Sequence, residues 1–143
     1  MQNASTLQFL LTLAKGIASQ FGPNCEVVVH DLATNDPERS IVAIENGHVT
    51  GRKVGDGPSH VVLEALRGNP EQLHDHLSYL TRTKDGKILK STTIYIRDDD
   101  GRPIGMFGIN YDITLMLAME NMLRQFTATE KESREPEAIS RNV

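Results

Sequence analysis

Alternation of apolar and polar positions is clearest between residues 78 and 113, where three β-prone runs are separated by two Asp-Gly turn signals. Glycine at Gly86 and Gly101 can take the positive φ that tight hairpin turns require. In the last run one set of alternating residues is apolar (Phe107, Ile109, Tyr111, Ile113) and the other is small or polar (Met106, Gly108, Asn110, Asp112). We therefore predict three antiparallel strands with one apolar face and one polar face.

Apolar residues at three- and four-residue spacing predict a helix near each end of the chain. The first stripe comprises Leu7, Leu10, Leu11, Ala14, Ile17, Ala18 and Phe21, and the second comprises Leu115, Met116, Met119, Met122, Leu123 and Phe126. Ser5 and Thr114 are the expected N-caps, because their hydroxyls can accept a bond from a free helical N–H. Phe9 and Leu13 widen the first stripe beyond one buried face, so this helix is a candidate for packing against a partner.

Two further strands are predicted at residues 25–32 (CEVVVHDL) and 40–45 (SIVAIE). The segment GDGP (residues 55–58) leads into a short helix over residues 58–67, and residues 71–76 are expected to add one more helical turn. The order of elements predicts an α+β fold. Its five-stranded antiparallel sheet would carry short helices on one face, with N- and C-terminal helices flanking it.

The length of 143 residues suits one folded unit, which we assign to residues 1–127. Residues 128–143 are polar and charged, and we expect a linker or disordered tail there. The net charge of −4 argues against nucleic-acid binding by this segment alone. Cys25 is the only cysteine, and neither a membrane-spanning run nor a secretion signal is found. We therefore expect a cytoplasmic protein without membrane contact.

Three segments carry a family resemblance: FGPNCEVVVHDL (21–32), SIVAIENGHVTGRKVGD (40–56) and KSTTIYIRDDDGRPIGMFGINYDIT (90–114). They resemble the PAS domain of YheO-like transcriptional regulators, a group with members similar to the D-arginine utilisation repressor. The resemblance covers residues 5–127 and implies a PAS-like sensor domain. In that family the domain is joined to a helix-turn-helix that binds DNA; no such pattern is found here, so we expect DNA contact only through a segment absent from this chain. Gly57 departs from the family, which runs from Gly-Asp directly to Pro.

The polar face of the meander supplies the first candidate site. Asn110 and Asp112 lie two residues apart and share a side, as do Ser91, Thr93 and Tyr95 on the neighbouring strand. The resemblance implies that short helices cover the cupped face of the sheet and leave room for a small molecule. Polar groups on a covered face suit a metabolite with donors and acceptors. The alternative is that these groups bond to the backbone or face solvent.

Other polar residues are weaker candidates. His30 could be tuned as an acid or base, although burial with one hydrogen bond is the simpler interpretation. Arg52 precedes the GDGP segment and could help to bind an anion at the start of the short helix, but the nearby Asp56 would repel an anion and a plain capped turn is the alternative. The histidines His60, His74 and His76 do not form a convincing metal-ligand set, and we predict neither a metal nor a cofactor.

Function follows from these observations as a set of hypotheses. The first is a sensory, metabolite-binding domain of a DNA-binding transcriptional regulator. The alternative is a ligand-free homodimerisation module whose interface uses the helices over residues 7–21 and 115–126. A small enzyme on the same scaffold is the third hypothesis. We predict that the chain is not an enzyme, because no nucleophile, base and orienting group occur together in the sequence.

Overall fold

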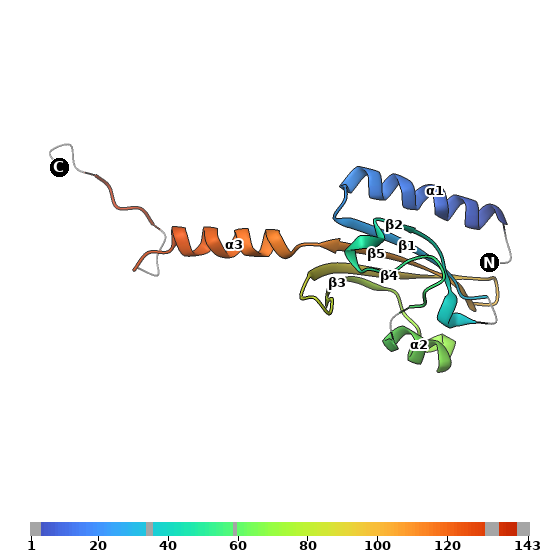
Figure 1. Cartoon of the computed structure of the whole chain (residues 1–143). Coiled ribbons are helices and arrows are strands. Elements are labelled where there is room, and N and C mark those ends of the chain that lie inside the picture. The colour runs from blue at the N-terminus through green and yellow to red at the C-terminus, as the bar shows by residue number, and fades with distance from the viewer. Residues whose placement is uncertain (1–3, 34–35, 59, 131–134, 140–143) are drawn as a thin grey trace.

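The computed structural model describes residues 4–33, 36–58, 60–130 and 135–139. These described residues form three α-helices and five strands, with three short 3-10 helices between them (Figure 1). They are α1 (Ala4–Phe21), β1 (Cys25–Asp31), η1 (Pro37–Arg39), β2 (Ile41–Glu45), η2 (Gly47–Val49), α2 (His60–Arg67), η3 (Pro70–Gln72), β3 (His76–Arg82), β4 (Ile88–Arg97), β5 (Pro103–Asp112) and α3 (Thr114–Thr127). The predicted α+β order is confirmed.

All five strands form one antiparallel sheet in the order β2-β1-β5-β4-β3. The meander β3-β4-β5 uses the two predicted turns, where Gly86 and Gly101 have φ values of 90° and 83°. Residue pairs across β4 and β5 are Ser91 with Asn110, Thr93 with Gly108, and Tyr95 with Met106. This register puts the polar side chains of both strands on the same face.

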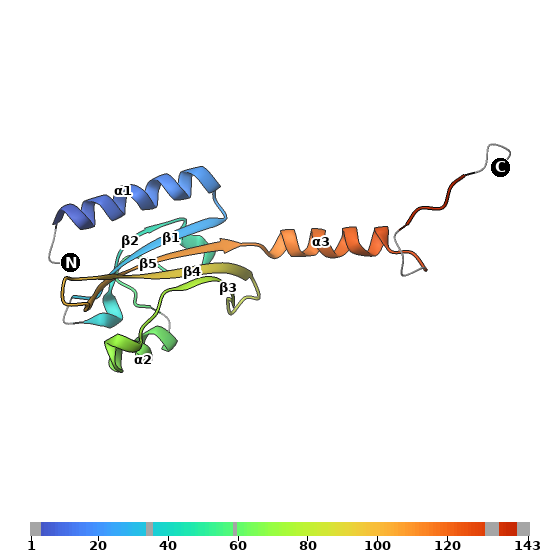
Figure 2. The same cartoon turned by 180° about the vertical axis from the view of Figure 1, so that it is seen from behind.

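Helix α1 covers the opposite, apolar face, as Figures 1 and 2 show from two sides. Its residues Leu10, Ala14 and Ala18 are buried and form the core together with Cys25, Val27, Val29 and Phe107. The two alanines allow the helix to lie close to β1, and Ile94, Ile96, Ile109 and Tyr111 extend the packing along the sheet. Gly22 ends the helix with φ 87°, and its N–H donates to the Ala18 carbonyl at 2.9 Å.

The segment from η2 to α2 lies on the other side of the sheet, with α2 below it in Figure 1 and Figure 2. Backbone bonds fasten this segment to the start of β2: the Ile41 N–H donates to Asp56 O at 2.9 Å and the Gly55 N–H to Ile41 O at 3.0 Å. Gly57 then passes so close to Glu38 that an added Cβ would lie 2.5 Å from its carbonyl oxygen. The glycine that departs from the family pattern is therefore required by this packing.

Three local expectations were wrong. Ser5 lies inside α1, which already includes Ala4, so it is not the N-cap. Thr114 is the first residue of α3, and the N-cap position belongs to Ile113, which has no capping side chain. Residues 71–76 do not add an α-helical turn: η3 ends at Gln72, and His76 begins β3, because pairing with β4 overrides the local helical pattern.

Helix α3 extends away from the rest of the molecule (Figures 1 and 2). None of its residues is buried, and Phe126 is 89% exposed. Beyond it, residues 128–130 and 135–139 form no helix or strand, while the remainder of the predicted tail lies outside the described residues. Among the described helices, none combines the length and apolar character that crossing a bilayer requires.

Candidate ligand-binding site

The sheet face opposite α1 carries polar side chains from four strands together with a few apolar ones, and we call it the polar face. Its members are Glu26, Val28 and His30 of β1, Met106, Gly108 and Asn110 of β5, Ser91, Thr93 and Tyr95 of β4, and Tyr79 and Thr81 of β3. Gly108 occupies the centre, where an added Cβ would lie 2.9 Å from Val28 Cγ1. The Val28 side chain therefore lies against Gly108 and leaves no room for a side chain at that position.

A chain of hydrogen bonds, which we call the polar ladder, crosses this face from the η2 side to β3. The Glu26 carboxyl group is fully buried and accepts from Thr50 Oγ1 at 2.6 Å, Thr50 N at 3.1 Å and Asn110 Nδ2 at 2.9 Å. Ser91 Oγ donates to Asn110 Oδ1 at 2.7 Å, and Thr81 Oγ1 lies 2.8 Å from Ser91 Oγ. Each member has a partner, as buried polar groups require.

The polar ladder changes the interpretation of two predicted ligand contacts. Asn110 and Ser91 lie on the predicted face, but their side chains are already engaged with Glu26 and Thr81. Thr93 is engaged as well, because the Tyr79 hydroxyl lies 2.8 Å from Thr93 Oγ1. Sequence reasoning missed Glu26, although a charged residue next to the apolar run of residues 27–29 was a signal that something polar must meet it inside the fold.

Asp112 plays a different part at the end of β5. Its carboxylate accepts from the Thr114 N–H at 3.0 Å and from Thr114 Oγ1 at 2.6 Å, so it caps the start of α3. Thr114 Oγ1 in turn accepts from the Ile88 N–H of β4 at 2.9 Å. The residue predicted to bind a ligand therefore fastens α3 to the two strands that carry Asn110 and Ser91.

Unpaired polar groups collect at the other end of the face, which we call the open end. His30 and Tyr95 lie on either side of Met106 in the register of β1, β5 and β4. The His30 ring is completely buried; its Nδ1 lies 2.7 Å from Ser40 Oγ, whereas its Nε2 has no partner. The half-buried Tyr95 hydroxyl forms no hydrogen bond within the described part of the chain.

Burial changes the acid–base behaviour of both groups. Burial, with a smaller contribution from the positive charge of Arg52, lowers the pKa of His30 to about 4, so its imidazole is neutral at pH 7. Burial also raises the pKa of Tyr95, and the nearby Tyr79 and Asp75 add to this shift while Arg97 opposes it. The open end therefore presents a neutral imidazole and a protonated phenol.

Two segments border the open end. Residues 50–55 reach from β1 to the start of β2, because Thr50 is bonded to Glu26 and Gly55 to Ile41, the residue paired with His30. Residues 73–75 lie along β4, where the Tyr95 N–H donates to Asp75 Oδ1 at 2.9 Å and the Arg97 guanidinium donates to Leu73 O at 2.5 Å. Helix α2 connects these two segments in the chain, and Figure 1 shows it below this part of the sheet.

Arg52 lies on the first of these segments. Its side chain is half-buried, and its guanidinium forms neither a hydrogen bond nor an ion pair with the residues that the structure describes. The nearby Asp56 carboxylate accepts from the Lys53 N–H at 3.0 Å, which holds the turn closed. Ser59, at the predicted helix start, lies outside the described residues. Arg52 thus stands on a fixed loop as a cation without a partner among the described residues, and its charge is near enough to His30 to help lower the pKa of that ring.

The described residues offer neither a metal-binding cluster nor an activated thiol. Within the described residues no three His, Cys, Asp or Glu side chains form a cluster that could hold a metal ion. His76 instead stacks on Tyr79, with ring centroids 3.7 Å apart. Cys25 is buried in the α1 core, and burial, together with the neighbouring Glu26, raises the pKa of its thiol.

These features define a PAS-like domain: a five-stranded antiparallel sheet with one face under an N-terminal helix, a polar face opposite, and a C-terminal helix leaving the last strand. The chain belongs to the YheO-like PAS domain family, whose model matches residues 1–128. This is a family of regulatory domains rather than of enzymes.

Curated relatives are longer than this chain. YheO of Escherichia coli, itself uncharacterized, is 39% identical over 106 residues, which are 68% of this chain and 40% of that protein. An uncharacterized protein of Haemophilus influenzae is 36% identical over 115 residues, which are 80% of this chain and 50% of that protein. The transcriptional regulator DauR of Pseudomonas aeruginosa is 28% identical over 137 residues, which are 96% of this chain and 61% of that protein. The chain is therefore a PAS-like domain related to a transcriptional regulator, and it spans 40% to 61% of these relatives.

Solved structures resemble the chain in fold. The dark structure of the Aureochrome1 LOV photoreceptor matches with a TM-score of 0.46 and 19% identity, over 81% of this chain and 91% of that one. The PAS domain of the fruit-fly ELK potassium channel matches with a TM-score of 0.43 and 18% identity, over 70% of this chain and 96% of that one.

Replacing Asn110 with Leu tests the polar ladder. The substitution leaves the charged Glu26 Oε1 without its partner and removes one of the two partners of Ser91 Oγ; an unsatisfied buried group costs about 1–3 kcal/mol, and more when it is charged. We expect urea unfolding to show a loss of about 2–4 kcal/mol in the free energy of unfolding. Asn121→Leu, on the exposed surface of α3, is the matched control and should change this free energy by less than about 0.5 kcal/mol. Equal effects of the two substitutions would contradict the ladder.

Protonation of His30 predicts a pH dependence of stability. The folded-state pKa of about 4 lies below the value of about 6.5 in the unfolded chain, so the unfolded chain binds the proton first as the pH falls. The free energy of unfolding should therefore decrease by about 2 kcal/mol between pH 7.5 and pH 5. His30→Gln should remove this part of the slope, as measured by urea unfolding at several pH values. A slope unchanged in the variant would exclude His30 as its source.

Proposed function

We propose that this chain is the sensory, ligand-binding domain of a DNA-binding transcriptional regulator. A small metabolite binds at the open end of the polar face, between residues 50–55 and residues 73–75. The observation that carries the proposal is the concentration of unpaired polar groups at this end, namely His30 Nε2, the Tyr95 hydroxyl and the Arg52 guanidinium. A buried polar atom without a partner is rare in a native structure, and a bound ligand would supply the missing hydrogen bond.

The route from this site to the rest of a regulator runs through β4 and β5. Both strands have one end at the open end of the polar face and the other at the first turn of α3, where Asp112 and Thr114 hold the helix to Ile88. A ligand that favours one arrangement of these strands also favours one direction of α3. The DNA-binding segment that would respond belongs to the full-length protein, as the resemblance to a longer transcriptional regulator suggests.

Removal of the Tyr95 hydroxyl tests ligand binding with little effect on the fold. Tyr95→Phe removes a hydroxyl that has no hydrogen-bond partner among the described residues, whereas Tyr111→Phe makes the same change on the α1 face. We expect the small-molecule fraction of a cell extract to raise the melting temperature of the wild type and of Tyr111→Phe, and to raise that of Tyr95→Phe less. Native mass spectrometry of the purified chain should show a retained metabolite. An empty protein that no fraction stabilises would overturn the proposal.

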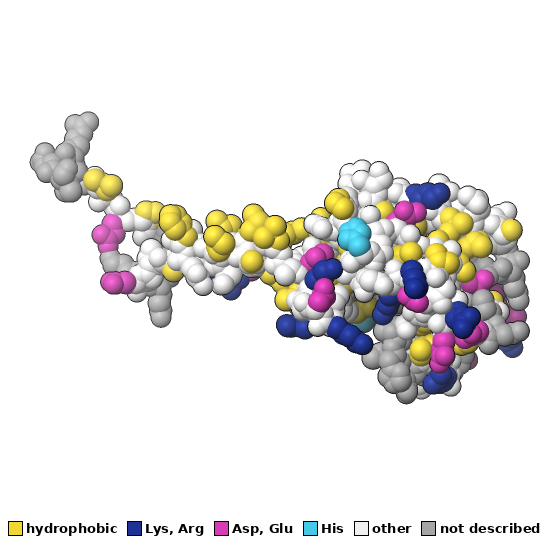
Figure 3. Space-filling view, in the orientation of Figure 1, with side chains coloured by type: hydrophobic (Ala, Val, Ile, Leu, Met, Phe, Trp, Pro, Cys, Tyr) yellow, Lys and Arg dark blue, Asp and Glu magenta, His cyan; other side chains and the backbone are white. Residues whose placement is uncertain are grey.

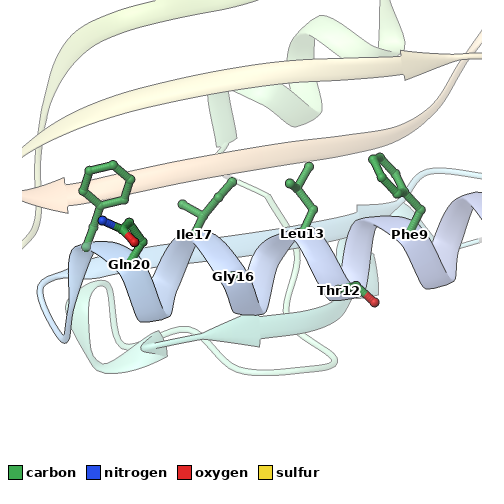
Figure 4. A pocket seen from close by; sticks show the side chains of 7 residues that line it. Phe9, Thr12, Leu13, Gly16, Ile17 and Gln20 are labelled. Atoms are coloured by element: carbon green, nitrogen blue, oxygen red, sulfur yellow. The ribbon is translucent and has the colours of Figure 1, made fainter.

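Homodimerisation is a second candidate function, favoured by the exposed apolar side of α3. Figure 3 shows hydrophobic side chains along this helix. Leu115, Met119, Met122 and Phe126 are between 53% and 89% exposed, and their spacing of four, three and four residues is that of a coiled-coil seam. On α1, a shallow groove contains Phe9, Leu13 and Ile17, which lie side by side along the helix, with Gly16 beside them (Figure 4).

A charge placed in the seam tests the dimer. Met119→Glu should weaken self-association by about a hundredfold or more, because two carboxylates would face each other across the interface. Asn121→Glu adds the same charge to the same helix away from the seam and should leave association nearly unchanged. Sedimentation equilibrium over a range of concentrations measures both. A wild-type chain that remains monomeric at high concentration would exclude this function.

A further inference from the structure

We propose that the ligand of the open end carries a carboxylate, which binds the Arg52 guanidinium and His30 Nε2, with its remaining part lying over Met106 toward the Tyr95 hydroxyl. This inference rests on the proposed ligand-binding function and names the chemical class that the site accepts. It depends on which polar groups around the site already have hydrogen-bond or ion-pair partners and which have none among the described residues.

The first argument is the orientation of His30. The bond between Nδ1 and the Ser40 hydroxyl fixes the ring and leaves Nε2 without a partner, although this atom is buried. When the Ser40 hydroxyl donates to Nδ1, the neutral ring carries its proton on Nε2 and offers it to an acceptor. In this tautomer, the open end contains a fixed N–H donor that needs an oxygen from outside the described chain.

The second argument is the unpaired charge of Arg52. Two carboxylates near its loop are engaged elsewhere: Glu26 accepts from Thr50 and Asn110, and Asp56 accepts from Lys53 N. The loop itself is anchored at both ends, through Thr50 to Glu26 and through Gly55 to Ile41. Arg52 is thus held between an anchor on β1 and an anchor on β2, close enough for its charge to act on His30. Because these two acids are occupied, its charge is left for a ligand.

The chemistry of His30 and Arg52 together indicates the class of ligand. A guanidinium and an imidazole N–H are both donors, and a planar carboxylate can accept from both at once. Met106, buried between His30 and Tyr95, provides an apolar floor, so the rest of the ligand is an organic body rather than a bare inorganic ion. Because His30 and Tyr95 are two strand spacings apart, or about 10 Å between backbones, the site suits a short-chain acid.

Chemical blocking of carboxylates tests the class without knowledge of the metabolite. The small-molecule fraction of a cell extract is treated with carbodiimide and ammonia, which convert carboxylates into neutral amides, and a second portion is treated with ammonia alone. We expect the second portion to raise the melting temperature of the wild type and the amidated portion to lose this effect. Inorganic phosphate, added alone, should not reproduce the shift.

Matched variants locate the contact. Arg52→Gln removes the charge from the proposed site, whereas Lys53→Gln removes the neighbouring, exposed charge and serves as the control. We expect the concentration of untreated fraction that gives half the maximal shift to rise about tenfold or more in Arg52→Gln and to stay unchanged in Lys53→Gln. The melting temperature of each variant without the fraction reports its folding separately.

The outcomes separate this inference from the proposed function. A shift that survives amidation, that phosphate reproduces, or that Arg52→Gln retains in full would overturn the carboxylate assignment and leave ligand binding intact. A wild type that responds to neither portion, and retains no metabolite, would overturn both. Loss of the shift on amidation and in Arg52→Gln, with Lys53→Gln unaffected, supports both.

Discussion

The burial of one carboxyl group, that of Glu26, organises the half of the molecule opposite α1. Because a buried carboxyl group must find donors, Thr50 has to come to it from the loop after η2 and Asn110 from β5. Asn110 in turn aligns Ser91, which aligns Thr81 on β3. This one constraint therefore relates four strands and the covering loop to each other, and any shift of β4 against β5 must break a hydrogen bond.

The polar face consequently has two parts with different roles. The ladder is closed, since each member satisfies the next, and it gives the sheet a definite register. The open end beside it is incomplete, since His30 Nε2, Tyr95 and Arg52 keep groups without partners in the described chain. The two parts share the strands β4 and β5, and Asp112 fastens α3 to their far ends. In the proposed sensor, the closed part acts as the rigid connection between the ligand and the helix.

Local sequence signals were sufficient for most of the fold and for the prediction that the polar residues of β4 and β5 share one face. Alternation and Asp-Gly turns predicted the meander, and the stripe of α1 predicted the buried residues Leu10, Ala14 and Ala18. The predicted polar set fell on one face, as the Ser91–Asn110 pairing shows. The role of each residue could not be predicted, because it depends on contacts with β1 and the loop after η2, which are distant in the chain. Glu26 and Thr50, which engage Asn110, were missed for this reason.

The sequence by itself determined which residues alternate, where the chain turns and which family the chain resembles. These properties depend on neighbours within a few positions, where side-chain chemistry and backbone preference act directly. Only the tertiary structure decided that α1 takes the apolar face, that the ladder occupies Asn110 and Ser91, and that His30, Tyr95 and Arg52 are left over. Whether a polar group is satisfied depends on partners brought to it by folding, and the linear pattern does not contain them.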